Sequence, residues 1–214
     1  MTITDDLFEE FNHLYLPSIN HQLTKELCRG TLSDSRLFTY LVQDLKYFDI
    51  GLNLFAKTMT LCDNMKSKIV LGKQIGFIAN DENDYFEKAI EELKLTVNDT
   101  IQDKVLPEVD QYLKYMTYLI EDSKSYPELV TALYFMEQVY LGWADLNMAS
   151  VPEDLEYKYK EWIDLHSGED FTKWTNFLRS EVDRVGSKDL KGVKSATEKV
   201  LTLELQFFDS CYNY

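Results

Sequence analysis

The stretch YLVQDLKYFD, residues 40–49, decides the fold of this chain, because its apolar and aromatic side chains recur at the spacing of an α-helix. One face of that helix carries Leu37, Tyr40, Leu41, Asp44, Tyr47 and Phe48. Such a face packs into the core of a helical protein, yet Asp44 places a carboxylate at its centre. A carboxylate buried without partners is costly, or it becomes neutral through a raised pKa. Asp44 on this face therefore requires an explanation.

Helical patterns cover most of the remaining chain. The predicted helices span residues 5–15, 18–28, 34–61, 64–79, 82–95, 108–123, 127–149, 152–165, 169–183 and 188–211. Pro17 is expected to end the first helix and Gly30 the second. Ser33 fits a helix cap, and Pro127 and Pro152 fit first-turn positions.

The segment TVNDTIQDKVLP, residues 96–107, has the composition of a loop. We find no alternating strand pattern, no internal repeat and no low-complexity segment. The sequence therefore predicts an all-α fold, a single domain over residues 1–214, with roughly eight to ten helices joined by short loops.

The charge of the chain restricts its partners. The formal net charge is −15 and the sequence pI is about 4.6. Such a chain repels phosphate backbones, so we expect no nucleic-acid binding. No Lys/Arg-rich amphipathic segment and no apolar run of spanning length is present, so we expect no membrane association.

The cysteines and the N-terminus indicate the compartment. Cys28, Cys62 and Cys211 lie far apart without CxxC spacing, which favours neither a disulfide framework nor a zinc site. The acidic stretch MTITDDLFEEFNHLYL lacks the basic and apolar regions of a signal peptide. We expect a cytoplasmic protein in a reducing compartment.

Metal-binding patterns are sparse. A di-iron bundle needs two Glu-x-x-His motifs, whereas this chain has three histidines and one such motif, EFNH at Glu10–His13. We therefore predict no metal and no cofactor. His166, in DLHSGEDF, is expected to face solvent at a helix end.

Two further acids, like Asp44, lie on the apolar faces of predicted helices. Glu137 interrupts the apolar stripe of the predicted helix 127–149, and Glu204 interrupts that of helix 188–211. A helix edge, a capping hydroxyl or an arginine could satisfy any one of them. Three acids on three inward faces favour instead a shared polar pocket that binds or protonates a ligand.

Aromatic side chains accompany these acids. Tyr47 follows Asp44 by one turn, Tyr115 lies on a mid-chain helix, and Phe207 follows Glu204. Aromatic residues at helical spacing are usually plain core. Beside misplaced acids they suit a flat heterocycle, which stacks on the rings while carboxylates bind its amine and ring nitrogens.

Several blocks of the chain together resemble one family. The pattern GTL at Gly30–Leu32 is followed by LFTYLVQDLKYF, YMTYL, TALYFMEQVY, YKEWIDLHSGEDF and LELQFF. In content and order these resemble the TenA (thiaminase II) family over nearly the full chain. The Gln-Asp-x-x-Tyr block and the C-terminal Leu-Glu-x-x-Phe block are the most specific.

The resemblance implies a haem-oxygenase-like all-α fold without haem, and salvage of a pyrimidine for thiamin synthesis. It implies that Asp44 holds the 4-amino group of the pyrimidine and that Tyr47 and Tyr115 stack on or border the ring. Glu204 is expected at a ring nitrogen as proton donor, with Phe207 at the pocket wall. It further implies a homotetramer or homodimer.

One departure from the family pattern concerns the nucleophile. Met136 fills the position of the family's catalytic cysteine, and Glu137 follows it. This resembles a Glu-type branch found in plants, archaea and some fungi, of which the chain is identified as a fungal-like member. His166 stands where the family has a tyrosine.

Two functions follow from these residues. The first is hydrolysis of a C–N bond in a 5-aminomethyl or 5-formamidomethyl 4-amino-2-methylpyrimidine. Glu137 acts either as general base on water or as the group that accepts the protons of the leaving amine, and Glu204 acts as general acid. The second is a non-catalytic pyrimidine-binding or regulatory protein of thiamin metabolism. An unrelated helical interaction protein is a third reading.

Overall fold

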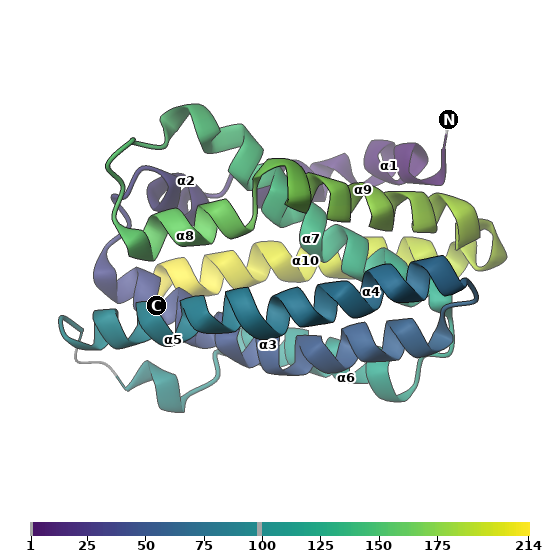
Figure 1. Ribbon diagram of the computed structural model, residues 1–214, viewed down its shortest axis with the longest axis horizontal. Helices are drawn as coiled ribbons and strands as arrows, with labels where there is room; N and C mark the ends of the chain where they lie inside the picture. The colour runs from purple at the N-terminus through teal and green to yellow at the C-terminus, as the bar shows by residue number, and fades with distance from the viewer. Residues whose placement is uncertain (1, 98–99) are drawn as a thin grey trace.

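The computed structural model describes residues 2–97 and 100–214, which form ten α-helices and no strand (Figure 1). The helices are α1 (Ile3–Ile19), α2 (Gln22–Cys28), α3 (Asp34–Leu61), α4 (Met65–Phe77), α5 (Asn83–Lys94), α6 (Pro107–Glu121), α7 (Tyr126–Asn147), α8 (Tyr157–Leu165), α9 (Gly168–Val185) and α10 (Leu190–Asn213). The predicted all-α fold is confirmed.

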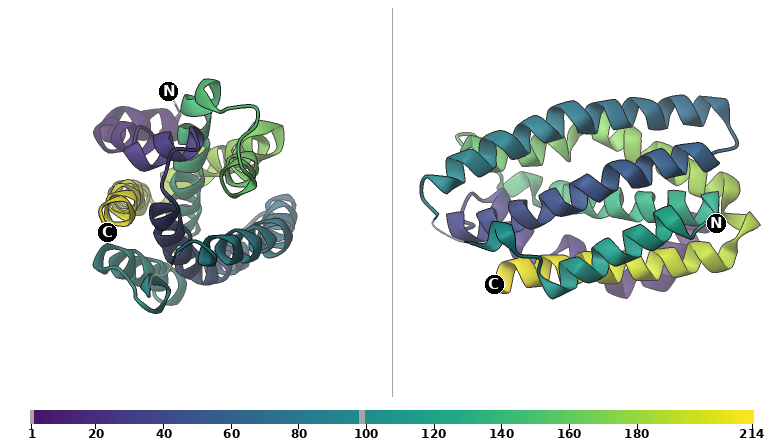
Figure 2. Two further views of the ribbon diagram at one scale, coloured as in Figure 1. Left: turned by 90° about the vertical axis from the view of Figure 1, so that its left-hand side faces the viewer. Right: turned by 90° about the horizontal axis from the view of Figure 1, so that it is seen from below.

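The axes of the long helices are roughly aligned with one another, and the helices enclose a shared core (Figure 2). Helix α10 packs against α7, α1, α6 and α3, and α7 also packs against α9. On the other side, α3 packs against α4, α5 and α6. Helix α7 is apolar around most of its circumference and is buried along most of its length, as expected for a central helix.

Side-chain caps fix where several helices begin. The hydroxyl of Ser33 accepts a hydrogen bond of 3.4 Å from the Arg36 amide, so the predicted start of α3 is confirmed. Ser125 caps α7 in the same way through the Glu128 amide, at 3.2 Å. Gly30 follows α2 with a φ of 67°, a left-handed conformation that ends the helix.

The predicted break at Pro17 is wrong, because α1 continues through this residue to Ile19. Proline removes one backbone donor, and so close to the helix end the loss of a single hydrogen bond is tolerated. The next helix begins only at Gln22, after the His21 side chain accepts a hydrogen bond of 3.1 Å from the Leu23 amide.

The predicted gap at residues 80–81 is also wrong. A π-helical turn, η1 (Ile78–Glu82), joins α4 to α5 without interruption. A π-helical turn holds an extra residue, which changes the direction of the side chains that follow it. Pro152 does not start a helix, because it lies in an irregular segment between the 3₁₀ turn η3 (Met148–Ser150) and α8.

The predicted loop at residues 96–107 includes residues 98–99, which lie outside the described residues. Its later part contains a 3₁₀ turn, η2 (Ile101–Asp103). Gln43 on α3 anchors this part, since its amide donates to the Lys104 carbonyl and accepts from the Leu106 amide, both at 3.0 Å. No described helix combines the length and the apolar character needed to cross a membrane.

A close approach of α1 and α7 provides a test of the packing. An added Cβ at Gly142 would meet the Tyr15 hydroxyl and would lie 2.7 Å from Ile19 Cγ2. We expect Gly142→Ala to lower the free energy of unfolding by about 1–3 kcal/mol through overpacking. Gly76→Ala is the matched control, because a Cβ there meets nothing within 4 Å and α4 should gain roughly 0.5–1 kcal/mol from the better helix former. Urea denaturation measures both, and equal effects would contradict this account of the interface.

Candidate active site

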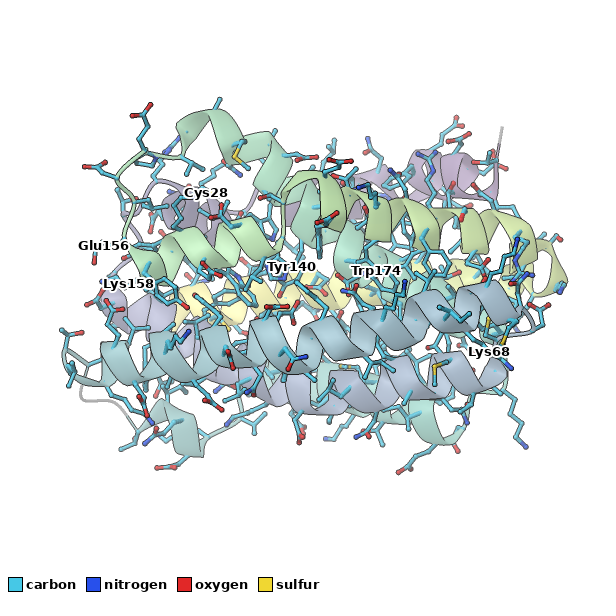
Figure 3. The ribbon with its side chains drawn as sticks, in the orientation of Figure 1. Cys28, Lys68, Tyr140, Glu156, Lys158 and Trp174 are labelled. Carbon is cyan, nitrogen blue, oxygen red and sulfur yellow. The ribbon has the colours of Figure 1, made fainter. Side chains whose placement is uncertain are left out.

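A cavity lies inside the bundle, between α3, η1, α5, α6, α7 and α8. Its lining is mostly apolar and aromatic with a few polar groups, which is typical of a small-molecule site. Three of the acids and aromatics singled out from the sequence lie on its wall: Asp44, Tyr47 and Glu137. Glu82, Tyr140, Trp162 and His166 line it as well. Figure 3 shows Tyr140 near the middle of the bundle, with Trp174 of α9 farther along it.

Asp44 stands at the end of a chain of hydrogen bonds from aromatic side chains. The Trp162 indole donates to the Tyr40 hydroxyl at 3.1 Å, Tyr40 donates to Tyr140 at 3.3 Å, and Tyr140 donates to Asp44 at a long 3.5 Å. Only 4% of Asp44 is exposed. This burial raises the pKa of its carboxyl to about 8, and the Tyr140 hydrogen bond opposes the rise.

Glu204 lies just behind the cavity wall rather than on it. The Tyr112 hydroxyl of α6 donates a hydrogen bond of 2.6 Å to its carboxylate, and the Tyr112 ring meets Tyr47 edge to face at 5.1 Å. Burial raises the pKa of Glu204 to about 8, Tyr112 opposes the rise, and the charges of Asp44 and Glu137 add to it. The three acids predicted from separate helices are therefore electrostatic neighbours.

The two remaining predicted residues do not line the cavity. Phe207 packs behind it, with its ring centroid 5.8 Å from that of Tyr40. Tyr115 is stacked on Tyr118 at 6.1 Å, and its buried hydroxyl has no hydrogen-bond partner among the described residues. The expectation that Tyr115 borders the ring does not fit this placement. The inward face of α6 instead carries Tyr112, and the spacing of its buried residues at 109, 112, 116 and 119 could have indicated this from the sequence.

Glu137 lies on the cavity wall beside Met136, the residue that fills the expected thiol position. Burial raises the pKa of Glu137 to about 8. The Trp174 indole N–H makes no hydrogen bond of good geometry within the described chain, yet it faces this carboxyl and opposes the rise. An indole N–H of this kind stabilises the ionised form of Glu137.

The expectation that His166 faces solvent is wrong, since only 5% of this residue is exposed. The end of α8 turns its ring inward, among the rings of Trp162, Tyr140 and Phe171. Burial lowers the pKa of His166 to about 4, so its imidazole is neutral at pH 7. Its Nε2 lies 3.9 Å from a carboxylate oxygen of Glu82, an acid that the sequence pattern did not single out.

The chemistry of this cavity is that of carboxyl groups in a dry aromatic enclosure. Burial raises the pKa of Glu82 well above its usual value, and the charges of Glu137 and Asp44 raise it further. Groups whose pKa lies near 8 can hold either protonation state at neutral pH, which general acid–base chemistry needs. Within residues 2–97 and 100–214, no three His, Cys, Asp or Glu side chains are arranged to hold a metal ion.

Comparison with known proteins identifies the family of this chain. A model of the TENA/THI-4/PQQC family matches residues 9–214. Among curated proteins, the aminopyrimidine aminohydrolase of Helicobacter pylori is 24% identical over 222 residues, which cover 99% of this chain and 99% of that protein.

Solved structures share the architecture. A TenA homologue from Pyrococcus furiosus superimposes with a TM-score of 0.85 at 19% identity, covering 98% of this chain and 99% of that one. A domain of unknown function with a heme oxygenase-like fold, from Shewanella denitrificans, gives a TM-score of 0.73 at 16% identity, covering 98% and 92%. The predicted haem-oxygenase-like fold is confirmed.

The raised pKa of Asp44 predicts how stability depends on pH. An unfolded aspartate titrates at about pH 4, so between about pH 4 and 8 the unfolded chain releases a proton that the folded carboxyl keeps. The free energy of unfolding therefore falls as pH rises, by on the order of 1 kcal/mol per pH unit for a group buried this fully. We expect Asp44→Asn to remove this contribution, so that it gains stability over the parent as pH rises from 5 to 8.

Urea denaturation at several pH values measures this difference. Asp49→Asn is the matched control, since Asp49 is an exposed aspartate on the same helix. A constant stability difference between the Asp44→Asn variant and the parent across this pH range would contradict the burial of an uncompensated carboxyl at position 44.

Proposed function

The chain belongs to the TENA/THI-4/PQQC family, and from this premise we propose that its cavity binds a 4-amino-2-methylpyrimidine and hydrolyses the C–N bond of its 5-aminomethyl or 5-formamidomethyl substituent. The observation that carries the proposal is the convergence of acids from three helices on one aromatic cavity, with Asp44 and Glu137 on its wall and Glu204 just behind it. The name of the Helicobacter pylori relative, an aminopyrimidine aminohydrolase, supports it.

In this proposal the ring is bound by groups at the centre of the cavity. Asp44 accepts the hydrogen bonds of the 4-amino group, and the Tyr140 hydroxyl keeps its carboxylate in place. Tyr47 and Tyr140 border the ring, because both line the cavity. Tyr112 holds Glu204 through its 2.6 Å hydrogen bond, which directs that acid toward a ring nitrogen.

The catalytic step uses two carboxyl groups in opposite protonation states. Glu137 in its ionised form accepts a proton from the attacking water, and Glu204 in its neutral form donates a proton to the ring nitrogen. Each acid has one donor that favours its ionised form, the Trp174 indole N–H for Glu137 and the Tyr112 hydroxyl for Glu204. The charges of Asp44 and Glu137 add to the raised pKa of Glu204, whereas no neighbouring charge adds to that of Glu137. The two environments thus favour opposite roles for the two acids.

A thiolate has no place in this scheme. Met136 stands on the wall where the family's cysteine is expected, and Cys28, Cys62 and Cys211 are free, buried and outside the lining. We therefore also propose membership of the Glu-type branch. A cytoplasmic location and assembly into a homotetramer or homodimer stay predictions that rest on composition and family resemblance.

The absence of that thiol also favours a second candidate, a non-catalytic protein that binds the pyrimidine as a carrier or sensor. Binding requires Asp44, Tyr47 and Glu204 but not Glu137. A turnover assay with the aminomethyl and formamidomethyl pyrimidines separates the two candidates. Thermal stabilisation by pyrimidine without product release would favour the binding protein.

Glu137→Gln should separate chemistry from binding. The substitution keeps the shape of the side chain but removes its ability to accept a proton. We expect kcat to fall by roughly 10²–10⁴ while the Kd for the hydroxymethyl product changes little. Glu204→Gln should impair both quantities, because Glu204 contacts the ring before and during the reaction.

Steady-state kinetics and product titration of the parent and both variants provide the comparison. An unchanged kcat in Glu137→Gln would remove this residue from the mechanism. Turnover that is undetectable in all three proteins, including the parent, would shift the conclusion to the non-catalytic candidate.

Turnover should survive alkylation of thiols. Burial raises the pKa of Cys28 to about 12 and that of Cys211 as well, which makes both thiols unreactive. The measurement is kcat before and after iodoacetamide treatment of the native protein. Loss of activity that Cys211→Ser prevents would show that a thiol takes part, since Cys211 is close enough to Asp44 to sense its charge.

A further inference from the structure

The cavity contains a second polar pair, Glu82 and His166, to which the ring-binding scheme gives no role. Glu82 is the last residue of η1, and His166 follows the last residue of α8. Both line the cavity. They come from segments that lie more than 80 residues apart in the chain, so only the tertiary fold brings them together.

His166 presents a fixed hydrogen-bond acceptor to the cavity. Its Nδ1 lies 2.8 Å from the Trp162 carbonyl oxygen, which can only accept, so Nδ1 carries the proton of the neutral ring. Nε2 therefore holds a lone pair, and it makes no hydrogen bond with any described residue. The Trp162 ring, whose centroid is 4.2 Å from that of the imidazole, holds this orientation.

Glu82 is a second unfilled acceptor. Its side chain is only 12% exposed, and its carboxylate receives no hydrogen bond from the described part of the chain. The separation of 3.9 Å between Glu82 and His166 Nε2 is too long for a direct hydrogen bond. A nitrogen donor of a ligand can satisfy both acceptors at once.

The position of Glu82 along the cavity is distinct from that of the ring-binding acid Glu204. The charges that act on Glu82 are those of Glu137, Asp44 and Asp81, whereas Glu204 is influenced by Asp44 and Glu137. Glu82 lines the cavity beside His166, whereas Glu204 lies behind the wall beside Tyr112, so the two acids hold different positions. No described lysine or arginine lines the cavity to repel a cation.

We propose that Glu82 and His166 form an amine subsite, which binds the protonated 5-aminomethyl group of the substrate and receives it as the leaving group. This inference rests on the proposed function. An ammonium group carries several N–H donors and a positive charge, which match a carboxylate, an imidazole lone pair and the surrounding acids.

The step that this subsite serves balances without a co-reactant other than water. The C–N bond breaks and its electron pair leaves with nitrogen as ammonia. The oxygen of water bonds to the methylene carbon, and the proton that water releases passes through Glu137 to ammonia. The protonated aminomethyl pyrimidine and water thus yield the hydroxymethyl pyrimidine and ammonium. The subsite retains the ammonium until it is released.

The test compares two ligands that differ only in the 5-substituent, the aminomethyl and the hydroxymethyl pyrimidine. The variants are Glu82→Gln and His166→Phe, and Asp84→Asn is the matched control, because it removes an exposed charge two residues after Glu82 and is not among the charges that act on Glu82. If a variant turns over the aminomethyl pyrimidine, its kcat/KM for this substrate is compared with the inhibition constant of the hydroxymethyl product. If a variant shows no turnover, direct titration gives the Kd values of both ligands.

We expect each variant to lose about tenfold in its preference for the amine, as the removal of one charge-assisted contact predicts, with little change for the hydroxymethyl ligand. Asp84→Asn should keep the preference of the parent. Equal weakening of both ligands, or an unchanged preference in both variants, would overturn the subsite while turnover by the parent still upheld the proposed function. A parent that binds neither pyrimidine would contradict the proposed function itself, and the subsite with it.

Discussion

The hydrogen bond of 2.6 Å from Tyr112 to Glu204 holds a carboxyl group where only 1% of the residue is exposed. This bond is one case of a wider constraint. The interior also contains Asp44, Glu137 and Glu82, and no lysine or arginine of the described chain lines the cavity to neutralise them. Desolvation raises the pKa of all four acids. Folding therefore carries the free-energy cost of burying these acids, and the aromatic core contributes stability that offsets it.

The bundle satisfies this constraint by placing hydroxyl and indole donors around the acids instead of cations. Tyr140 donates to Asp44, and the Trp174 indole N–H faces Glu137. Such donors stabilise a carboxylate without adding a positive charge, so they leave the cavity with an affinity for cationic or amine-bearing ligands. An arginine in their place would make the acids permanently ionised and would remove their ability to exchange protons near neutral pH.

Two acidic groups in different surroundings make the site asymmetric. Glu204, behind the cavity wall, is bound by Tyr112, which contacts Tyr47, whereas Glu82 on the wall faces the lone pair of His166. A substrate with a flat ring and one amine arm matches this asymmetry. The arrangement depends on the π-helical turn η1, since a regular α-helix at these residues would turn Glu82 to a different side.

Periodicity in the chain was enough to establish the helices, the inward faces of α3, α7 and α10, and the three acids on them, because a spacing of 3.6 residues assigns each side chain to a face. The same rule, applied more strictly to α6, would have placed Tyr112 rather than Tyr115 on the inward face. It could not have predicted the inward position of His166 or its approach to Glu82. They depend on the end of α8, on a π-helical turn and on contacts between distant segments, and periodicity says which face is buried but not which residue lies opposite.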